Sequence, residues 1–450
     1  MAVSKITLSD PGIDKLPKEV LVEIFKQTHQ TKKEHVHCIY LAVLARVCSH
    51  WRTVALGTPT LWADILITDY EEKAAAHAHA HLERSKTGPL FLTLFAFTGA
   101  DAREMIEDLI IKYAERWRGV TLITNSEKVV DVLLTAMSGS LSFPDLRDVE
   151  ISLYSKYSPS KPILCQNAPS LRRCRLHNIT SFPPLPSNLV VLEYICTESS
   201  KAPSSLDSLL KFLPHVASSL EHLRFKSCCI EGPAILCESK ILLRNLKSLL
   251  IEEAHIIMNY IHTPNLTYFS AQYAYCRIAE VVAKMFDDFT APKLQSLRFC
   301  RAPLKPLLTS LNIPSMFPQL ESVMFAQCKN EAEFIQLLEP SEPEKQAENP
   351  FPKLKELAIS SMENWAPLKA AIEKRIKNGG NSLQKIGLPK PDFTGADTGV
   401  KLILYNPGKW WESIPPKFQD DFYYKSASSV EKDYRMNLMN ELCNNARAGL

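Results

Sequence analysis

The fold prediction for this chain depends on the pattern in one stretch, Ala291-Pro292-Lys293-Leu294-Gln295-Ser296-Leu297-Arg298-Phe299. We count positions from Leu294 and call the resulting pattern the frame. Its first residue is a leucine, and apolar residues stand at its fourth and sixth positions, Leu297 and Phe299. Because successive side chains of a β-strand point to opposite faces, the fourth and sixth side chains are predicted to point inward and the fifth outward. The proline two residues before the leucine ends the preceding helical segment, since it restricts the residue before it to extended conformations. The stretch therefore predicts a short strand.

The same frame recurs along the middle of the chain, with a mean spacing of about 26 residues. Its leading leucines are Leu146, Leu171, Leu189, Leu220, Leu246, Leu266, Leu294, Leu320, Leu354 and, in a weaker copy, Leu383. This spacing lies within the roughly 20–29 residues of leucine-rich repeats, which the frame resembles. No single unit can bury its apolar face, so the units are predicted to stack into a parallel sheet with a returning segment on the other side.

The resemblance to leucine-rich repeats departs at the ninth position of the frame, where regular repeats favour asparagine or cysteine. This chain has Cys228 and Cys328 there, but also Ile179, Ala254, Ala274, Ala302 and Met362. We therefore expect an irregular array with uneven curvature. The alternative is that proline–leucine punctuation recurs by chance in an ordinary α/β domain.

The N-terminal segment predicts two amphipathic helices. Leu16-Pro17 suits the start of a helix, and the apolar stripe that follows consists of Val20, Leu21, Ile24 and Phe25. The polar residues from Gln27 to Glu34 are interpreted as a loop. Leu41, Leu44, Val47, Cys48 and Trp51 then recur at steps of three and four and predict a second helix. These stripes bury against each other, against the rest of the chain, or against a partner.

The strings LPKEVLVEIF, LAVLARVCSHWRTVA and TPTLW, within residues 13–65, closely resemble an F-box. In that family the helical stripes dock into the Skp-type adaptor of a Skp–cullin–F-box (SCF) ubiquitin ligase. The resemblance implies this role for the matching positions, some of which belong instead to the internal core. The implied adaptor-binding residues are Leu16, Pro17, Val20, Leu21, Ile24, Phe25, Val47 and Trp51.

Residues 66–140 form a helix and strand junction that leads into the repeats. Helices are predicted over 70–86 and 101–117, and strands over 90–95 and 120–123. His77 and His81 would share one face of the first helix at a spacing that a metal could use. Neither a cysteine nor a carboxylate completes the set, so a solvated helix face is the favoured interpretation and no metal site is predicted.

The three remaining segments are interpreted as a loop and two terminal elements. Residues 339–350 are acidic and proline-rich, which predicts an exposed loop within the repeat region, 141–390. Residues 391–450 lose the frame but contain Trp410, Trp411, Phe418 and the run 422–424. They are interpreted as a cap over the last repeat, or alternatively as a partner-binding tail. Residues 1–12 form an N-terminal tail.

Composition and missing motifs exclude several function classes. A formal net charge of +3 does not predict a nucleic-acid partner, and no stretch is long and apolar enough to predict a membrane span. The twelve scattered cysteines favour reduced thiols in the cytoplasm, the nucleus or both. Phosphate-binding glycine loops, serine-hydrolase elbows and zinc-protease motifs do not occur. We therefore expect neither an enzyme nor a cofactor.

The predicted fold class is α/β, with an N-terminal helical F-box followed by an irregular leucine-rich-repeat solenoid that contains a parallel sheet. The predicted function is that of a non-catalytic substrate-recognition adaptor subunit of an SCF-type ubiquitin ligase, which binds the Skp-type adaptor and through it a cullin. The repeats would bind a protein target that the sequence does not identify. The candidate target-binding residues, chosen from predicted surface positions of the strands, are Arg147, Glu150, Arg172, Arg173, Arg175, Glu193, Glu221, Arg224, Lys247, Arg298 and Glu321. The alternative is a repeat scaffold that acts outside the ligase.

Overall fold

The structure is a computed structural model of the chain. It describes residues 16–31, 37–68, 74–95, 107–138, 141–157, 167–179, 186–196, 204–227, 240–253, 255–272, 292–302, 304, 317–328, 331–338, 351–360, 366–377, 383–388 and 401–404. The chain divides into two compact units, one of Met1–Glu150 with Tyr423–Leu450 and one of Ile151–Phe422. Within the described ranges, no helix has the length and apolar character that crossing a membrane requires.

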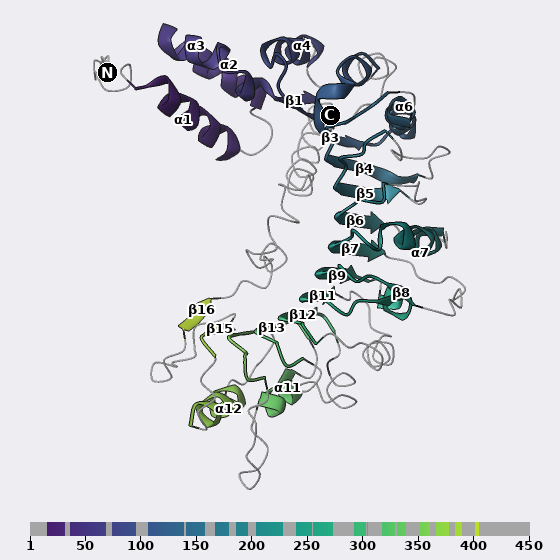
Figure 1. The fold of residues 1–450 in the computed structure, drawn as a ribbon. Coiled ribbons are helices and arrows are strands. Elements are labelled where there is room, and N and C mark those ends of the chain that lie inside the picture. Colours follow the sequence, from purple (N-terminus) through teal and green to yellow (C-terminus); the bar gives the residue numbers. More distant parts are fainter. Residues whose placement is uncertain are drawn as a thin grey trace, which may run out of the picture. The chain divides into compact units, whose positions relative to one another are not determined.

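The first unit begins with three helices and continues as alternating helix and strand (Figure 1). Its helices are α1 (Lys18–Thr31), α2 (His37–Val47), α3 (Ser49–Leu56), α4 (Ala74–Arg84) and α6 (Glu127–Ser138). Short turns lie at η2 (Pro59–Trp62), η3 (Glu107–Ile111) and η4 (Ala114–Arg116). Its strands are β1 (Asp64–Thr68), β2 (Leu90–Phe95) and β3 (Trp117–Thr124), and β4 (Asp148–Tyr157) begins here.

Three sequence predictions in this unit are corrected. Helix α1 continues through Thr31, so the loop does not begin at Gln27. The second predicted helix is broken at Cys48, whose extended backbone (φ −155°, ψ 173°) separates α2 from α3. The Cys48 sulfur accepts a hydrogen bond from the backbone N–H of Trp51 at 3.4 Å and so caps the first turn of α3. The described part of 101–117 contains only short π and 3₁₀ turns, and Trp117 starts β3.

The second unit consists mainly of short parallel strands. They are β5 (Arg173–Ile179), β6 (Val191–Cys196), β7 (His222–Ser227), β9 (Ser248–Glu252), β11 (Tyr268–Gln272), β12 (Ser296–Cys300), β13 (Ser322–Ala326), β14 (Glu356–Ile359), β15 (Lys385–Leu388) and β16 (Lys401–Leu404). Between them lie α7 (Ser204–Val216), η5 (His255–Asn259), α11 (Glu331–Leu338), α12 (Ala366–Lys377) and the parallel pair β8 (Ile241–Leu242) and β10 (Ile261–His262).

Every leucine frame of the sequence coincides with a strand, from β4 at Leu146 to β15 at Leu383. Among the described residues, fourteen strands form one sheet in the order β1-β2-β3-β4-β5-β6-β7-β9-β11-β12-β13-β14-β15-β16. Neighbouring frames pair in register, so that Leu297 of β12 lies opposite Phe269 of β11 and Val323 of β13. The predicted fold class is confirmed: N-terminal helices precede a long parallel sheet in a solenoid-like arrangement.

The fourth and sixth positions of the frame form the inner face of the sheet, together with the leading leucines. Leu297 and Phe299 of β12 are almost completely buried. Rings at the sixth position stack across neighbouring strands, with centroids 5.6 Å apart for Tyr194 and Phe225 and 6.3 Å apart for Phe299 and Phe325. We call this side of the sheet the leucine side and the opposite side the outward face.

Polar side chains immediately before the leading leucines join neighbouring repeats. Each donates a hydrogen bond to the carbonyl oxygen two residues before the leucine of the preceding frame. The bonds run from Asn188 to the Pro169 oxygen, from Ser219 to the Ser187 oxygen, from Asn245 to the Ser218 oxygen (2.5 Å) and from Asn265 to the Arg244 oxygen (2.8 Å). The sequence analysis missed this series, because it searched the ninth position of the frame for the bonds that hold the turns.

The eighth position of the frame adopts a left-handed backbone in four repeats, although no glycine stands there. The residues are Asn178 (φ 59°), Glu253 (φ 56°), Arg301 (φ 55°) and Gln327 (φ 55°). At Asn178 the side-chain amide donates to the carbonyl oxygen of Leu153 at 2.7 Å and joins two repeats. Side-chain bonding of the turns thus occurs at the eighth position for Asn178, and at the expected ninth position for Cys328, whose Sγ donates to the Phe299 oxygen at 3.5 Å.

Candidate protein-interaction surfaces

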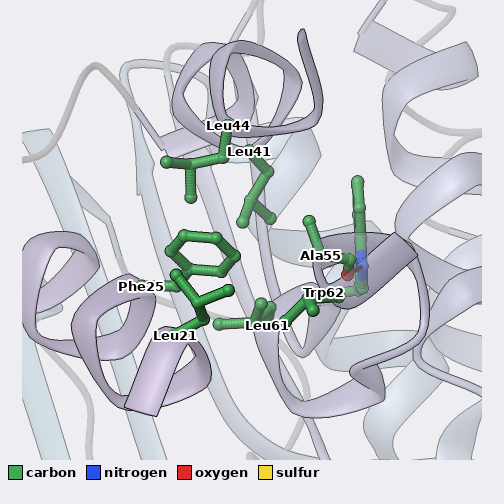
Figure 2. Close-up of a cluster of buried hydrophobic side chains, with 8 residues drawn as sticks. Leu21, Phe25, Leu41, Leu44, Ala55, Leu61 and Trp62 are labelled. Carbon is green, nitrogen blue, oxygen red and sulfur yellow. Dashed lines mark hydrogen bonds between the residues drawn. The ribbon is translucent and has the colours of Figure 1, made fainter. Parts of the chain in front are cut away.

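The three N-terminal helices enclose a small apolar core (Figure 2). Leu21 and Phe25 of α1 point toward Leu41 and Leu44 of α2, and residues of α3 and η2 close the cluster. Its buried members are Leu21, Phe25, Leu41, Leu44, Val54, Ala55, Leu61 and Trp62. The Phe25 ring meets the edge of Trp51 with centroids 5.1 Å apart. The bundle therefore has a closed core of its own.

Large apolar side chains remain on the solvent side of the same helices. The exposed fractions are 44% for Val20, 40% for Ile24, 50% for Val43, 54% for Val47 and 39% for Leu56. Val20 and Ile24 are four residues apart on α1, and Val43 and Val47 are four apart on α2, so each pair shares a helix face. We call these five residues the exposed apolar set. Exposed apolar groups gathered on one small bundle are typical of a protein-binding surface.

The structure separates the eight residues that the F-box resemblance implied. Val20, Ile24, Val47 and Pro17 are exposed, whereas Leu16 and Trp51 are half-buried against the core. Leu21 and Phe25 have no exposed surface, so they belong to the internal core that the sequence analysis left as the alternative. The sequence analysis missed Val43 and Leu56. The spacing of Val43 four residues before Val47 was the available signal.

Comparison with known families now bears on this bundle. Residues 13–68 match the family model described as F-box-like, nearly the range that the resemblance covered. The chain thus contains an F-box-like domain, a class of domain that in general binds Skp-type adaptors and suggests an adaptor role in SCF ligases. The match ends at residue 68 and does not extend to the strands of the second unit. No curated protein matches the chain.

A network of ion pairs lies on the outward face of β5, β6, β7 and β9. Glu193 is its centre: its Oε2 lies 3.2 Å from Arg175 Nε and its Oε1 lies 2.8 Å from Arg224 Nη1. Arg224 also donates to Glu252 Oε1 at 2.8 Å, and Lys226 Nζ lies 3.0 Å from Glu252 Oε2. The network therefore crosses four neighbouring strands.

The charges of this network stabilise each other's ionised forms. Burial by itself would raise the pKa of Glu193, but the Arg224 and Arg175 guanidinium groups outweigh it and hold that pKa below its usual range. The pKa of Glu252 is lowered in the same way, since Arg224 and Lys226 outweigh its burial. Both carboxylates are therefore ionised at neutral pH.

His177 lies beside this network on β5. Burial lowers its pKa to about 4; Glu193 opposes this shift, whereas Arg224 and Arg175 reinforce it. Its Nδ1 is 3.2 Å from Ser152 Oγ. His177 is therefore neutral at physiological pH and contributes no charge to the network.

The other end of the outward face is less charged. The Arg298 guanidinium lies over the Tyr268 ring, 5.4 Å from its centroid. Next to them, a buried cluster consists of Cys300, Met324, Ala326 and Ala358. The outward face of the second unit thus changes from ion pairs on β5–β9 to apolar side chains on β12–β14.

The candidate target-binding residues divide into two groups. Those at the fifth position, Glu150, Arg175, Glu193 and Arg298, are buried, and Arg224 is partly buried. Those at the second position, which are Arg147, Arg172, Glu221, Lys247 and Glu321, are exposed or half-buried, and Arg173 at the third position is half-buried. The expectation that the fifth position faces solvent is therefore wrong. The alternation of a strand predicts the face of the sheet to which a side chain points, but it does not show whether other residues bury that side chain.

The histidine pair on α4 does not form a solvated face. His77 is exposed, whereas His81 is buried against Trp62, with ring centroids 4.9 Å apart. Burial lowers the pKa of His81 to about 4, so the side chain is neutral. The described part of the chain holds no group of three histidine, cysteine or carboxylate side chains that could bind a metal ion.

Proposed function

We propose that this chain is a substrate-recognition subunit of an SCF-type ubiquitin ligase, and that the exposed apolar set is its contact with the Skp-type adaptor. The observation that carries the proposal is the division of α1 and α2 into a buried and an exposed apolar face. The core is complete without Val20, Ile24 and Val47. Burying such side chains in a partner yields about 25 cal/mol per Å² of apolar surface.

The second unit would hold a target protein while the adaptor links the chain to a cullin. Tethering raises the effective concentration of the target's lysines near the ubiquitin-charged enzyme, and another subunit performs the transfer. The chain itself would be non-catalytic and would act in the cytoplasm, the nucleus or both. Exposed charges beside the strands, such as Arg147, Arg172 and Lys247, would contribute to selection of the target more than to affinity.

Adaptor binding tests the proposal with the full chain. The variant Ile24→Asp/Val47→Asp places two charges in the exposed apolar set, and we expect it to weaken binding to a purified Skp-type adaptor at least tenfold. Ile111→Asp is the matched control, since Ile111 is 42% exposed on the same unit outside the F-box-like domain. We expect both variants to melt at the wild-type temperature.

Three results would contradict parts of this proposal. Equal adaptor affinity of the wild type and the double variant would remove the exposed apolar set as the contact. No adaptor binding by the wild type would favour the alternative of a scaffold outside the ligase. Adaptor binding without incorporation into a cullin complex would favour the same alternative.

A further inference from the structure

The edge of the second unit at which its strands begin carries unbalanced positive charge. We call the two residues before and the one residue after each leading leucine, from Leu171 to Leu354, the start edge. Its charged residues are the six cations Arg172, Arg244, Lys247, Lys293, Lys353 and Lys355 and the two carboxylates Glu221 and Glu321. The start edge therefore has an excess of four positive charges.

The edge at which the strands end is balanced. Among the described residues at the seventh, eighth and ninth positions of the same frames, the charged side chains are Lys226 and Arg301 against Glu252 and Glu253. The formal net charge of the whole chain is only +3. The excess on the start edge is therefore a local feature and does not follow from a strongly basic chain.

Both carboxylates of the start edge are already engaged. Glu221 Oε2 lies 2.5 Å from Lys247 Nζ, and Glu321 Oε2 lies 3.1 Å from Lys355 Nζ. Each pair joins neighbouring repeats, and all four side chains are at least one-third exposed. Carboxylates thus bind lysines along this edge in water, and neither carboxylate neutralises a further cation of the edge.

The other cations of the start edge are exposed and have no carboxylate partner in the part of the chain that the structure describes. They are Arg172, Arg244, Lys293 and Lys353. Arg172 donates to the backbone oxygen of Asn188. Lys353 donates to the side-chain oxygen of Gln319 on the neighbouring repeat. Both acceptors are neutral, so four full positive charges remain open to an anionic partner.

Three of these cations recur at every second strand. Arg244, Lys293 and Lys353 precede the leucines that lead β9, β12 and β14, and one strand lies between each pair (Figure 1). A strand spacing of about 4.8 Å places neighbouring members of the series roughly 10 Å apart. A polyproline II segment advances about 3.1 Å per residue, so every third side chain lies on the same side after roughly 9 Å. An acidic residue at each third position can therefore meet all three cations.

The residue types of the start edge favour a protein partner over a nucleic acid. Proteins that bind single-stranded nucleic acids stack the bases on aromatic side chains. No position of the start edge holds an aromatic residue; its uncharged positions are mostly proline, serine, asparagine and glutamine. Such side chains offer hydrogen bonds to a peptide and give no stacking surface for bases.

We propose that the start edge of the second unit binds an extended acidic segment of another protein, whose carboxylates recur at every third residue and pair with Arg244, Lys293 and Lys353. One exposed ion pair contributes little, so affinity comes from several pairs formed together at matching spacing. That the segment belongs to a ubiquitination target rests on the proposed function. The binding itself does not require the adaptor.

Charge reversal in the full chain tests the edge. The probe is a fluorescein-labelled peptide of four Glu-Pro-Pro repeats, and fluorescence anisotropy measures its affinity at low salt. We expect Arg244→Glu/Lys293→Glu/Lys353→Glu to weaken binding at least about tenfold, because attraction becomes repulsion at three sites. The control Lys128→Glu/Lys211→Glu/Lys369→Glu reverses three exposed helical lysines, and we expect a loss below about threefold. Should the first variant melt below the wild type, Arg244→Gln/Lys293→Gln/Lys353→Gln replaces it.

A second peptide of the same composition, with its four glutamates in one run, tests the spacing. We expect the wild type to bind it at least about threefold more weakly, because one run cannot reach cations on three separated repeats. No binding of the spaced peptide, equal losses in the edge and control variants, or equal affinity for the two peptides would overturn the proposal. A single-stranded oligonucleotide that binds more tightly than the spaced peptide would overturn it as well. No measurement involves the adaptor, so either proposal can fail without the other.

Discussion

Glu193 and Arg224 face each other in register on β6 and β7, with Glu193 Oε1 2.8 Å from Arg224 Nη1. Glu193 is buried and also binds Arg175, so one carboxylate neutralises guanidinium groups on both neighbouring strands. Because ordinary strand alternation would place these three charges in water, their pairing makes this part of the outward face a closed polar layer. The network is therefore a structural element of the second unit.

We expect Glu193→Gln to destabilise the chain by about 3–5 kcal/mol, because it removes the carboxylate that the buried Arg175 and the partly buried Arg224 share, and Arg224 keeps only its pair with Glu252 among these contacts. The matched control is Glu221→Gln, which removes a carboxylate from the more exposed pair with Lys247. Its cost should be below about 1 kcal/mol. Urea unfolding monitored by circular dichroism measures both. Similar midpoints for the two variants would show that the network contributes little.

The pKa of His177, lowered to about 4, makes stability depend on pH. In the unfolded chain its pKa is near 6.5, so between about pH 6.5 and pH 4 the unfolded chain binds a proton that the folded chain does not. The contribution of His177 to the free energy of unfolding is fully present above pH 6.5 and falls toward pH 4. The loss between pH 7 and pH 5 is about 2 kcal/mol.

The groups facing His177 are Ser152, Glu193, Arg175, Arg224 and Glu252. Glu193 and Glu252 have lowered pKa values, so their contributions to stability are lost only at lower pH. The change in stability between pH 7 and pH 5 therefore reports on histidine. His177→Gln should reduce the pH dependence of the urea midpoint in this window, and the part that remains comes from His81, whose pKa is also lowered to about 4. His215→Gln, at an exposed site on α7, is the control. An unchanged slope in His177→Gln would refute the assignment.

The hydrogen bonds between neighbouring repeats predict a modest, local loss of stability. Asn245→Ala removes the bond to the Ser218 oxygen, and we expect a cost of about 1 kcal/mol. Lys293→Ala changes an exposed residue at the same position of its repeat, before Leu294, and should stay within about 0.5 kcal/mol of the wild type. Thermal unfolding of the full chain compares them. Equal melting temperatures would mean that water replaces the Asn245 bond at no cost.

Glu253 predicts a stabilising substitution. Its backbone has φ 56°, a conformation that costs a side chain energy and that glycine adopts without strain. Its N–H donates to the Gln272 oxygen at 2.9 Å, a bond that glycine retains. We expect Glu253→Gly to raise stability by up to about 1 kcal/mol, whereas Glu253→Ala keeps the strain and should not. Stabilisation by both would point to the charge of Glu253 instead of its backbone.

Periodicity located the strands because the signal is local. A leucine, an apolar fourth residue and an apolar sixth residue are enough to place β12 at Leu294 and β15 at Leu383. The helix cap and the turn conformations were harder to predict from the sequence. The break at Cys48 depends on a sulfur that accepts a hydrogen bond from Trp51, and an apolar residue in that role gives no clear pattern. The left-handed turn at Glu253 is likewise unmarked, since no glycine stands there.

The amino-acid order alone determined the helical N-terminal segment, its resemblance to an F-box, and the stack of parallel strands, since each follows from spacing within a few residues. Only the tertiary structure decided which apolar side chains of α1 are enclosed and which stay outside. Phe25 and Ile24 are adjacent in the chain, yet one is fully buried and the other is 40% exposed. The same holds for Glu193, whose burial depends on arginines supplied by two other strands. Burial is a property of the elements packed around a residue, and a single helix or strand does not contain that information.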